Sequence, residues 1–346
     1  MVNLTDPPIV GERRPPTITL EGWRRFVQED PVNLDLLPDD ARASLTPEQR
    51  LAYDDARIRY HSELVVVKTS TVREVTHQGR LLMLLNQREI GARRGLIVSG
   101  AWATGKSTAI KQLGRTHELR VRTQYPEDDR IPVVYVTTPP KGSPRKLAAE
   151  FARFLGLPAI VKPRYNVTDI ADVVCQVLTD ARTDLVIVDE IHNLNLGTSA
   201  GEDMSDHLKY FTEHLPATFV YAGINVEREG LFTGVRGKQI AARCVLTRTG
   251  SFPYKQEWKD LVATFEQTLR LHDHTTGTLV GLSKYLHQRT SGVISSLSHL
   301  VRAAAIKAIL DESEQITRQL LDTIQLDHAA EEAMPAPSRT RTRSTG

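Results

Sequence analysis

Five short apolar runs divide the middle of this 346-residue chain, and longer segments of mixed character separate them. The runs lie at residues 96–98, 132–136, 185–188, 216–222 and 244–246. Runs that are apolar at successive positions are typical of strands buried on both faces of a parallel sheet. Because each crossover is long, the strand–helix alternation predicts an α/β fold whose parallel sheet has helices on both faces.

Apolar residues at spacings of three and four predict helices before and after this region. Thr46-Pro47-Glu48-Gln49 forms a capping box with proline at the first helical position, which predicts a helix through about residue 64. A second box, opening at Thr71, predicts a helix whose apolar residues at 75, 81, 82, 84 and 85 face a core. Segments 257–271, 279–290, 294–310 and 316–324 predict a small helical domain.

These patterns divide the chain into four parts. Residues 1–45, rich in proline and charge, are expected to form a flexible arm, and residues 46–252 the α/β domain with its N-terminal helices. Residues 253–328 are expected to form a helical lid domain. Residues 329–346 contain proline and several arginines, a composition that predicts a disordered basic tail.

The stretch after the first apolar run carries the clearest chemistry. Residues 100–107 read G-x-x-x-x-G-K-S, the phosphate-binding loop, followed by a helix to about residue 113 and a polar surface connection at 115–130. Gly100 and Gly105 let the backbone turn its N–H groups toward phosphate oxygens, and Lys106 faces the β- and γ-phosphates. Ala103 replaces a frequent glycine, which predicts lowered affinity. Nucleotide contacts are expected from Gly100, Ala101, Trp102, Ala103, Thr104, Gly105, Lys106, Ser107 and Thr108.

Two carboxylates end the third apolar run, in the Walker B arrangement. Asp189 is expected to hold Mg²⁺, directly with the Ser107 hydroxyl or through water. Glu190 is expected to polarise the water that attacks the γ-phosphate. Asn225, just after the fourth strand, is a candidate for orienting that water, the alternative being a simple strand-ending turn. These residues predict an ATPase with ATP and Mg²⁺ as cofactors.

Arg243 stands before the fifth strand, at the expected edge of the domain. There it is a candidate for reaching the γ-phosphate of a neighbouring subunit, the alternative being a surface arginine in a local salt bridge. Arg236 and Arg248 are rivals for the same role. An arginine supplied in this way predicts hydrolysis that is slow and depends on an oligomer.

Composition narrows the setting of the protein. The net charge is only +2, so any nucleic-acid surface must be local. Cys175 and Cys244 lack metal-ligand spacing, and the N-terminus lacks the pattern of a signal peptide. No run of 18 apolar residues occurs, so we expect no membrane partner and a cytoplasmic location. His272-Asp273-His274 is better interpreted as a solvated loop than as a metal site.

Together these features resemble an AAA+ ATPase, and more narrowly a TniB/TnsC-type transposition regulator. The resemblance covers about residues 45–325. It is carried by residues 94–100 before the phosphate loop, 188–194 at Walker B, 239–243 before the fifth strand, and 290–309 with 316–317 in the lid. One departure is Ser295, which stands near where many AAA+ proteins place a sensor arginine.

The resemblance implies ATP-dependent rings or filaments around duplex DNA that recruit a transposase to target sites. Contacts of this kind go to phosphates and carry little sequence information. The candidate surface consists of Lys141, Arg145, Lys146, Lys162 and Arg164. The alternatives are another DNA-associated or secretion-associated AAA+ ATPase, or a nucleotide-dependent signalling switch with little turnover.

Overall fold

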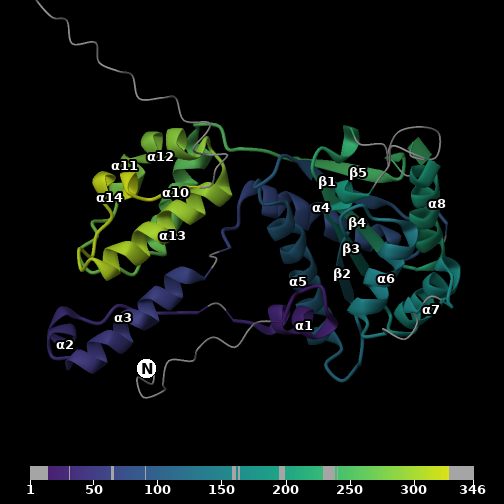
Figure 1. The fold of residues 1–346 in the computed structure, drawn as a ribbon, viewed down its shortest axis with the longest axis horizontal. Helices are drawn as coiled ribbons and strands as arrows, with labels where there is room; N and C mark the ends of the chain where they lie inside the picture. The colour runs from purple at the N-terminus through teal and green to yellow at the C-terminus, as the bar shows by residue number, and fades with distance from the viewer. Residues whose placement is uncertain are drawn as a thin grey trace, which may run out of the picture. The chain divides into compact units, whose positions relative to one another are not determined.

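The computed structural model describes residues 15–30, 32–63, 66–89, 91–157, 161–162, 164–194, 199–228, 238–239 and 241–326 (Figure 1). The chain forms two compact units. One, which we call the sheet unit, contains the described residues of 15–30 and 68–250. The other, the helical unit, contains those of 32–67 and 251–326. Each unit is therefore assembled from separate stretches of chain.

The sheet unit is built on five parallel strands in the order β2-β3-β4-β1-β5. The strands are β1 (Gly95–Gly100), β2 (Val133–Thr137), β3 (Leu185–Asp189), β4 (Thr218–Gly223) and β5 (Cys244–Thr249). The central strands are buried along nearly their whole length, as continuous apolar runs require. The predicted parallel α/β fold is confirmed.

Helices cover both faces of this sheet. One layer contains α4 (Ser70–Asn86) and α5 (Lys106–Gln124), and the other contains α6 (Pro144–Phe154), α7 (Val167–Asp180) and α8 (Ser199–His214) (Figure 1). Two short 3₁₀ helices, η2 (Ile191–Asn193) and η3 (Val226–Arg228), follow β3 and β4. They shape the loops at the carboxyl edge of the sheet.

Two predictions about α4 and α5 were wrong. Helix α4 is capped by Thr69, whose hydroxyl accepts a hydrogen bond from the Val72 N–H, so it begins before Thr71. Helix α5 continues through Gln124, because its charged residues either lie on the exposed side, as Arg120 does, or are paired, as the buried Glu118 is with Arg122. Of the predicted core positions in α4, 75 and 82 are buried, whereas the leucines at 81, 84 and 85 are exposed.

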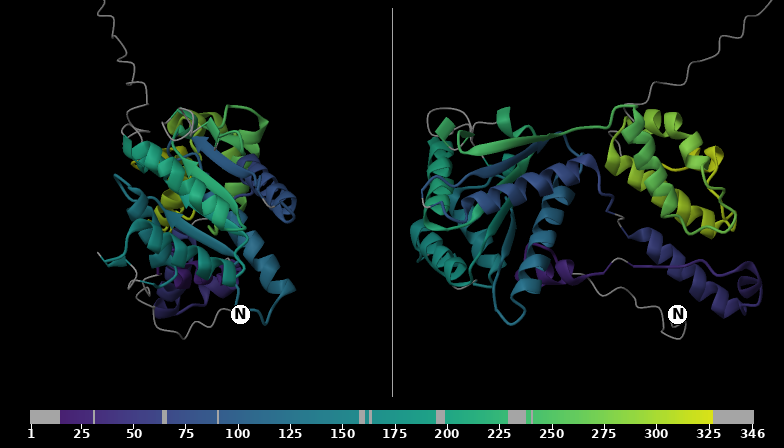
Figure 2. Two further views of the ribbon diagram at one scale, coloured as in Figure 1. Left: turned by 90° about the vertical axis from the view of Figure 1, so that its right-hand side faces the viewer. Right: turned by 180° about the vertical axis from the view of Figure 1, so that it is seen from behind.

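The N-terminal arm was expected to be flexible, but its described part contains an ordered helix, α1 (Leu20–Gln28). Helix α1 lies beside α5 in every view (Figure 1, Figure 2). Trp23 and Val27 are fully buried within the main core of the sheet unit. Arg115 of α5 donates hydrogen bonds to the carbonyls of Val27 and Glu29, which fixes the end of α1. The buried Trp23 side chain, hydrogen-bonded to Glu118 of α5, therefore makes this segment part of the sheet unit.

The helical unit has its own core, around Trp258, Leu286 and Leu300. Its described helices are α2 (Asp39–Ala43), α3 (Pro47–Ser62), α10 (Gln256–Gln267), α11 (Thr278–Gly281), α12 (Ser283–Thr290), α13 (Ile294–Leu310) and α14 (Arg318–Asp322). The capping box at Thr46 is confirmed. However, α3 packs on α13. The boundaries expected at residues 45 and 252 therefore differ from the observed ones, since residues 32–67 belong with the C-terminal helices.

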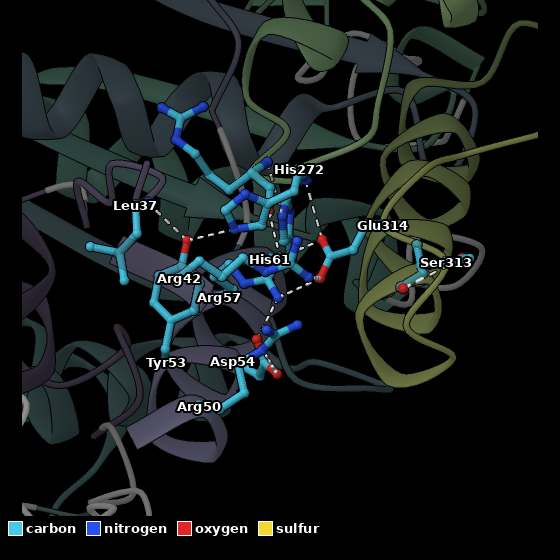
Figure 3. Close-up of polar contacts among 12 residues, drawn as sticks. Leu37, Arg42, Arg50, Tyr53, Asp54, Arg57, His61, His272, Ser313 and Glu314 are labelled. Atoms are coloured by element: carbon cyan, nitrogen blue, oxygen red, sulfur yellow. Dashed lines mark hydrogen bonds and ion pairs between the residues drawn. The ribbon is translucent and has the colours of Figure 1, made fainter. Parts of the chain in front are cut away.

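A buried polar cluster joins α3 to the C-terminal helices (Figure 3). The Arg57 guanidinium, fully buried, donates two hydrogen bonds to Glu314, with N–O distances of 2.6 and 2.7 Å. Arg42 donates a third at 2.9 Å, and Asp54 accepts from Arg57 at 2.5 Å. His272 lies against Tyr53, 3.0 Å from its hydroxyl. This histidine thus has a structural partner within the helical unit.

In the part of the chain that the structure describes, no single helix is long and apolar enough to cross a membrane. Helices α12 and α13 are long and apolar enough only when the two are taken together, and they are bent by 117° at their junction.

Candidate phosphate-binding site

The loop between β1 and α5 has the geometry of a phosphate cradle. Gly105, at its end, has φ 86°, a left-handed conformation that favours glycine. Lys106 opens α5, and its Nζ lies inside the loop, 3.0 Å from the Gly100 carbonyl and 2.6 Å from the Ala101 carbonyl. Burial lowers the pKa of Lys106, and the nearby charges of Glu190 and Asp189 oppose that shift. The ammonium is therefore fixed where phosphate oxygens are expected.

Strand β5 fixes the start of this loop. A Cβ at Gly100 would lie 2.2 Å from the Thr249 carbonyl oxygen, so glycine is required here by close approach rather than by its φ angle. The Thr104 hydroxyl donates to the Ala101 carbonyl at 2.8 Å and lies 2.7 Å from the Thr249 hydroxyl. Ala103 has φ 60°, so the residue that departs from the usual glycine carries backbone strain. Thr249 is a positioning residue that the motif alone did not reveal.

Asp189 is held from two directions. It is 2% exposed at the carboxyl end of β3. The Tyr135 hydroxyl, on β2, donates to Oδ2 at 2.8 Å, and the Glu190 backbone N–H donates to Oδ1 at 2.8 Å. Because a carboxylate accepts about four hydrogen bonds, Asp189 keeps acceptor capacity for a cation or its water. Tyr135 gives no signal in the sequence, since it lies 54 residues before its partner.

Glu190 adopts a left-handed backbone conformation, with φ 55° and ψ 35°. Such strain in a residue other than glycine costs about 1–3 kcal/mol and is concentrated at functional sites. His192 connects Glu190 to the end of β4: its Nδ1 accepts from the Ile224 N–H at 3.2 Å, and its Nε2 lies 3.3 Å from Glu190 Oε2. Asn225 is exposed in the turn that follows, with φ 45°. His192 was missed as a site residue because sequence spacing did not reveal this contact.

The donor set fits Mg²⁺. Ser107, in the first turn of α5, and Asp189, at the end of β3, supply a hydroxyl and a carboxylate. Oxygen ligands of this kind are what Mg²⁺ prefers, together with phosphate oxygens and water. Among the described residues, no cluster of three or more His, Cys, Asp or Glu side chains has the arrangement of a metal site. A cation here would therefore depend on the nucleotide for further ligands.

A second ion pair lies at the same edge of the sheet. The Ser99 hydroxyl, on β1, donates to Glu227, and Ser99 Oγ accepts from the Val226 N–H at 2.9 Å. Arg248, on β5, lies 3.2 Å from Glu227. Burial would raise the pKa of Glu227, but the hydrogen bonds from Ser99 and Arg248 outweigh it and the pKa is lowered. Arg248 therefore lies near its own phosphate loop, opposite Ser99 in the β1–β5 register.

Arg243 lies at the other end of β5. The register pairs Gly95 with Cys244 at the start of β1 and β5, and Gly100 with Thr249 at their end. Arg243 is exposed and contributes to a pocket of about 440 Å³ with Arg93, Arg94 and Lys209. Phe219 and Tyr221 of β4, and Ala217 just before it, also line this pocket. Of the two rivals, Arg248 is ion-paired as above, and Arg236 lies outside the described residues.

The two basic segments are brought together on the sheet unit. Arg145 donates hydrogen bonds to the carbonyls of Tyr165 and Lys162, the latter at 3.0 Å, so it joins the start of α6 to the loop before α7. Lys146 and Lys162 are exposed on either side. Lys141 is exposed too, and Arg164 stacks on Tyr165, with its Cζ 4.8 Å from the ring centroid. Arg145 thus holds the loop, and the other four cations remain accessible.

In the helical unit, the lid features expected from the sequence have defined positions. Ser295 is exposed in the first turn of α13. His274 Nε2 lies 3.1 Å from Glu266 Oε1, inside the core of this unit. The two histidines of the His-Asp-His segment therefore serve packing and hydrogen bonding.

Comparison with known proteins agrees with this geometry. The family model for Bacterial TniB protein matches residues 57–245, more than half of the chain. No curated protein matches the sequence. Among solved structures, the Aeropyrum pernix ORC1 protein in complex with DNA is similar at 15% identity, with a TM-score of 0.57 over 79% of this chain and 66% of that chain. The chain thus spans just under two thirds of that structure.

Two further structures agree. The Aeropyrum pernix ORC2 protein, in ADPNP-ADP complexes, has 15% identity and a TM-score of 0.58, over 81% of this chain and 72% of that chain. Pyrobaculum aerophilum Cdc6p has 16% identity and a TM-score of 0.50, over 73% and 65%. At such identities the likeness shows the fold. The chain belongs to the TniB family and has the fold of the AAA+ P-loop ATPases.

Proposed function

We propose that the protein binds ATP with Mg²⁺ and hydrolyses it slowly, as an oligomer on duplex DNA that recruits or regulates a transposase. The observation that supports this best is that a lysine and two carboxylates meet at one edge of the sheet. Lys106 follows β1, and Asp189 and Glu190 end β3, with β4 lying between these two strands. Charges that stabilise phosphate and a base that activates water are thereby brought within one site.

Two substitutions separate binding from hydrolysis. Lys106→Ala should abolish nucleotide binding, because it removes the buried ammonium of the loop. Glu190→Gln should bind ATP and not release phosphate, since the amide cannot polarise water. Binding is measured with a fluorescent ATP analogue and turnover by phosphate release. Unchanged phosphate release from Glu190→Gln would show that Glu190 is not the base. Nucleotide binding without turnover in the wild-type protein would instead favour a signalling switch.

We infer that Arg243 acts on a neighbouring subunit. Six residues of β5 separate it from its own phosphate loop, which at ~3.3 Å per residue is about 20 Å. An arginine side chain cannot cover that distance. The surrounding pocket contains three further cationic side chains, Arg93, Arg94 and Lys209, which suit the triphosphate of a nucleotide bound to another subunit. The exposed leucines of α4 supply apolar surface for association.

The test mixes two inactive proteins. An arginine supplied in trans is worth ~10³-fold or more in rate, so Arg243→Ala should be inert. Mixing it with Glu190→Gln should restore activity where an intact site meets an intact Arg243. Arg248→Ala is mixed in parallel, because Arg248 is the rival for this role that the structure describes; Arg182→Ala is the control, since it removes an exposed arginine that is paired only at the surface. If every mixture stays inert, Arg243 does not have the trans role.

Duplex DNA is the proposed binding partner of the oligomer. Support comes from the exposed cations that Arg145 holds together, and from the DNA in the ORC1 complex, which shares this fold. Net charge is only +2, so one subunit should bind weakly and several should bind more tightly together. Lys146→Ala and Lys162→Ala should each weaken binding similarly on unrelated sequences. Removing the cation that neutralises one phosphate should reduce the slope of log affinity against log salt by about 0.9.

Fluorescence anisotropy with and without ATP decides the DNA proposal. Lys284→Ala serves as control, since it removes an exposed lysine of the helical unit. Equal binding with and without nucleotide, or none at low salt, would remove DNA from the function. A transposase gene beside this one would favour the transposase proposal. Co-purification with the encoded transposase tests it: ATP-dependent capture is expected, and its absence counts against recruitment.

A further inference from the structure

Helix α1 is docked on the sheet unit by a buried tryptophan. Trp23 is fully buried, and its Nε1–H donates to Glu118 Oε2 at 2.5 Å. Glu118 is 1% exposed on α5 and also accepts from Arg122. A Cβ at Gly114 would lie 2.8 Å from the Trp23 ring. Glycine inside a helix costs about 1 kcal/mol relative to alanine, so α5 gives up stability to make room for this ring.

Trp23 also contacts a residue that reaches the phosphate-binding site. Its ring stacks on Tyr135, with centroids 5.7 Å apart and planes 13° from parallel. Lys111 Nζ lies 4.9 Å from the centroid of the Tyr135 ring. The Tyr135 hydroxyl then donates to Asp189 Oδ2 at 2.8 Å. A continuous set of contacts therefore runs from α1 to the carboxylate at the end of β3.

We propose that Tyr135 is a positioning residue for the Asp189 carboxylate, and that α1 is part of the nucleotide site because Trp23 holds Tyr135 in place. This rests on the Mg²⁺-dependent nucleotide binding proposed above. The hydroxyl fixes one oxygen of Asp189 while the Glu190 N–H fixes the other. The remaining acceptor capacity is thereby oriented toward the cation. The N-terminal segment then acts on the chemistry without touching nucleotide.

Tyr135→Phe in the full chain is the direct test. It keeps the ring against Trp23 and removes only the hydroxyl. Loss of a group that orients a metal ligand typically lowers metal affinity 10–100-fold, so we expect the apparent Mg²⁺ affinity to fall by about 10-fold or more. Binding of a fluorescent ATP analogue is titrated with Mg²⁺ at fixed nucleotide. Affinity for the analogue in EDTA should match wild type, because Lys106 and its loop are unchanged.

Gly114→Ala tests the contribution of α1. The added methyl would lie 2.8 Å from the Trp23 ring, with a looser contact of 3.1 Å to Ile187 Cδ1 on β3, and it improves the helix propensity of α5. The apparent Mg²⁺ affinity should fall in the same direction as for Tyr135→Phe. Tyr285→Phe is the matched control, since it removes a similar tyrosine–aspartate hydrogen bond, to Asp322, in the helical unit. It should leave the Mg²⁺ dependence unchanged.

The outcomes separate the two ideas. Wild-type Mg²⁺ dependence in Tyr135→Phe overturns the positioning role while leaving ATP binding intact. A shift in Tyr135→Phe but none in Gly114→Ala overturns the role of α1. A wild-type protein whose nucleotide binding ignores Mg²⁺ removes the proposed function itself. A shift in both variants, at unchanged affinity in EDTA, supports the proposal.

Discussion

Glu314 is the residue on which the helical unit should depend most strongly, and Glu314→Gln is the change that tests it. The side chain is 1% exposed and accepts two hydrogen bonds from Arg57 and one from Arg42. Glutamine keeps the shape of the side chain and one acceptor oxygen. It removes the charge that balances the buried Arg57 guanidinium. The variant therefore isolates electrostatics from packing.

The magnitude follows from burial. Removing one partner of a buried ion pair costs about 3–5 kcal/mol, because the other charge is left without compensation. Asp54 still accepts from Arg57 at 2.5 Å and is partly exposed, so we expect a loss near the lower value, about 3 kcal/mol. For a domain of about 100 residues this lowers the melting temperature by more than about 10 °C.

Tryptophan fluorescence gives an assay that is specific to each unit. Trp258 is fully buried in the helical core and Trp23 in the sheet core. Urea unfolding is followed in proteins that retain one of these two, with the other tryptophans replaced by phenylalanine. Glu314→Gln should lower the midpoint reported by Trp258 more than that reported by Trp23. Glu312→Gln is the control, since Glu312 is exposed two residues away.

A double variant completes the test. Arg57→Met combined with Glu314→Leu replaces the pair with apolar side chains, which is often neutral or stabilising by about 1–4 kcal/mol. The double variant should therefore be more stable than Glu314→Gln alone. A loss below about 1 kcal/mol in Glu314→Gln, or full additivity of the single Arg57→Met and Glu314→Leu losses in the double variant, would refute the reasoning.

Four further predictions concern the loop and the polar cluster. Gly100→Ala should lower the melting temperature of the sheet unit, because its methyl meets the Thr249 carbonyl; thermal unfolding checks this. Ala103→Gly should raise unfolding free energy by up to about 1 kcal/mol by relieving left-handed strain, measured by urea titration. Trp102, 64% exposed in the loop, should change fluorescence on adding ATP, and Trp102→Phe should abolish that change. Burial alone would raise the pKa of Glu314, but hydrogen bonds from Arg57 and the nearby arginines lower it below its usual value. The stability of the helical unit should therefore fall as the pH drops below about 4.5 and this carboxylate is protonated. The fall, measured by urea unfolding at several pH values, should be smaller in Glu314→Gln, which has no carboxylate at this position.

The local parts of the site were predictable from sequence. Lys106 and Ser107 belong to one contiguous motif, and Asp189 and Glu190 end one apolar run, so spacing alone placed them at the same edge of a parallel sheet. The buried strands were predictable for the same reason, since each is a continuous apolar run. Arg243 was expected at the domain edge, and β5 is an edge strand.

The long-range parts were not predictable. Tyr135 meets Asp189, and Trp23 meets Glu118, across separations of 54 and 95 residues. Nothing in the local pattern of α1 shows which aromatic residue will find a buried partner. The grouping of α3 with the C-terminal helices depends on the ion pair between Arg57 and Glu314. Sequence reasoning expects charged residues of this kind to lie in solvent. Contacts of this kind come from tertiary packing, which local propensity does not encode.

The divided make-up of the helical unit has a consequence for the order in which the protein is made. Arg57 leaves the ribosome 257 residues before Glu314. At about 5–20 residues per second, roughly 10–50 s separate the two. During that interval the segment 68–250, which supplies every strand of the sheet unit, is complete, while α3 still lacks α13 and carries a guanidinium without its main counter-ion. Helix α13 and Glu314 therefore complete the fold of a helix that was synthesised long before them, and a fragment beginning near residue 250 lacks the helix on which α13 packs.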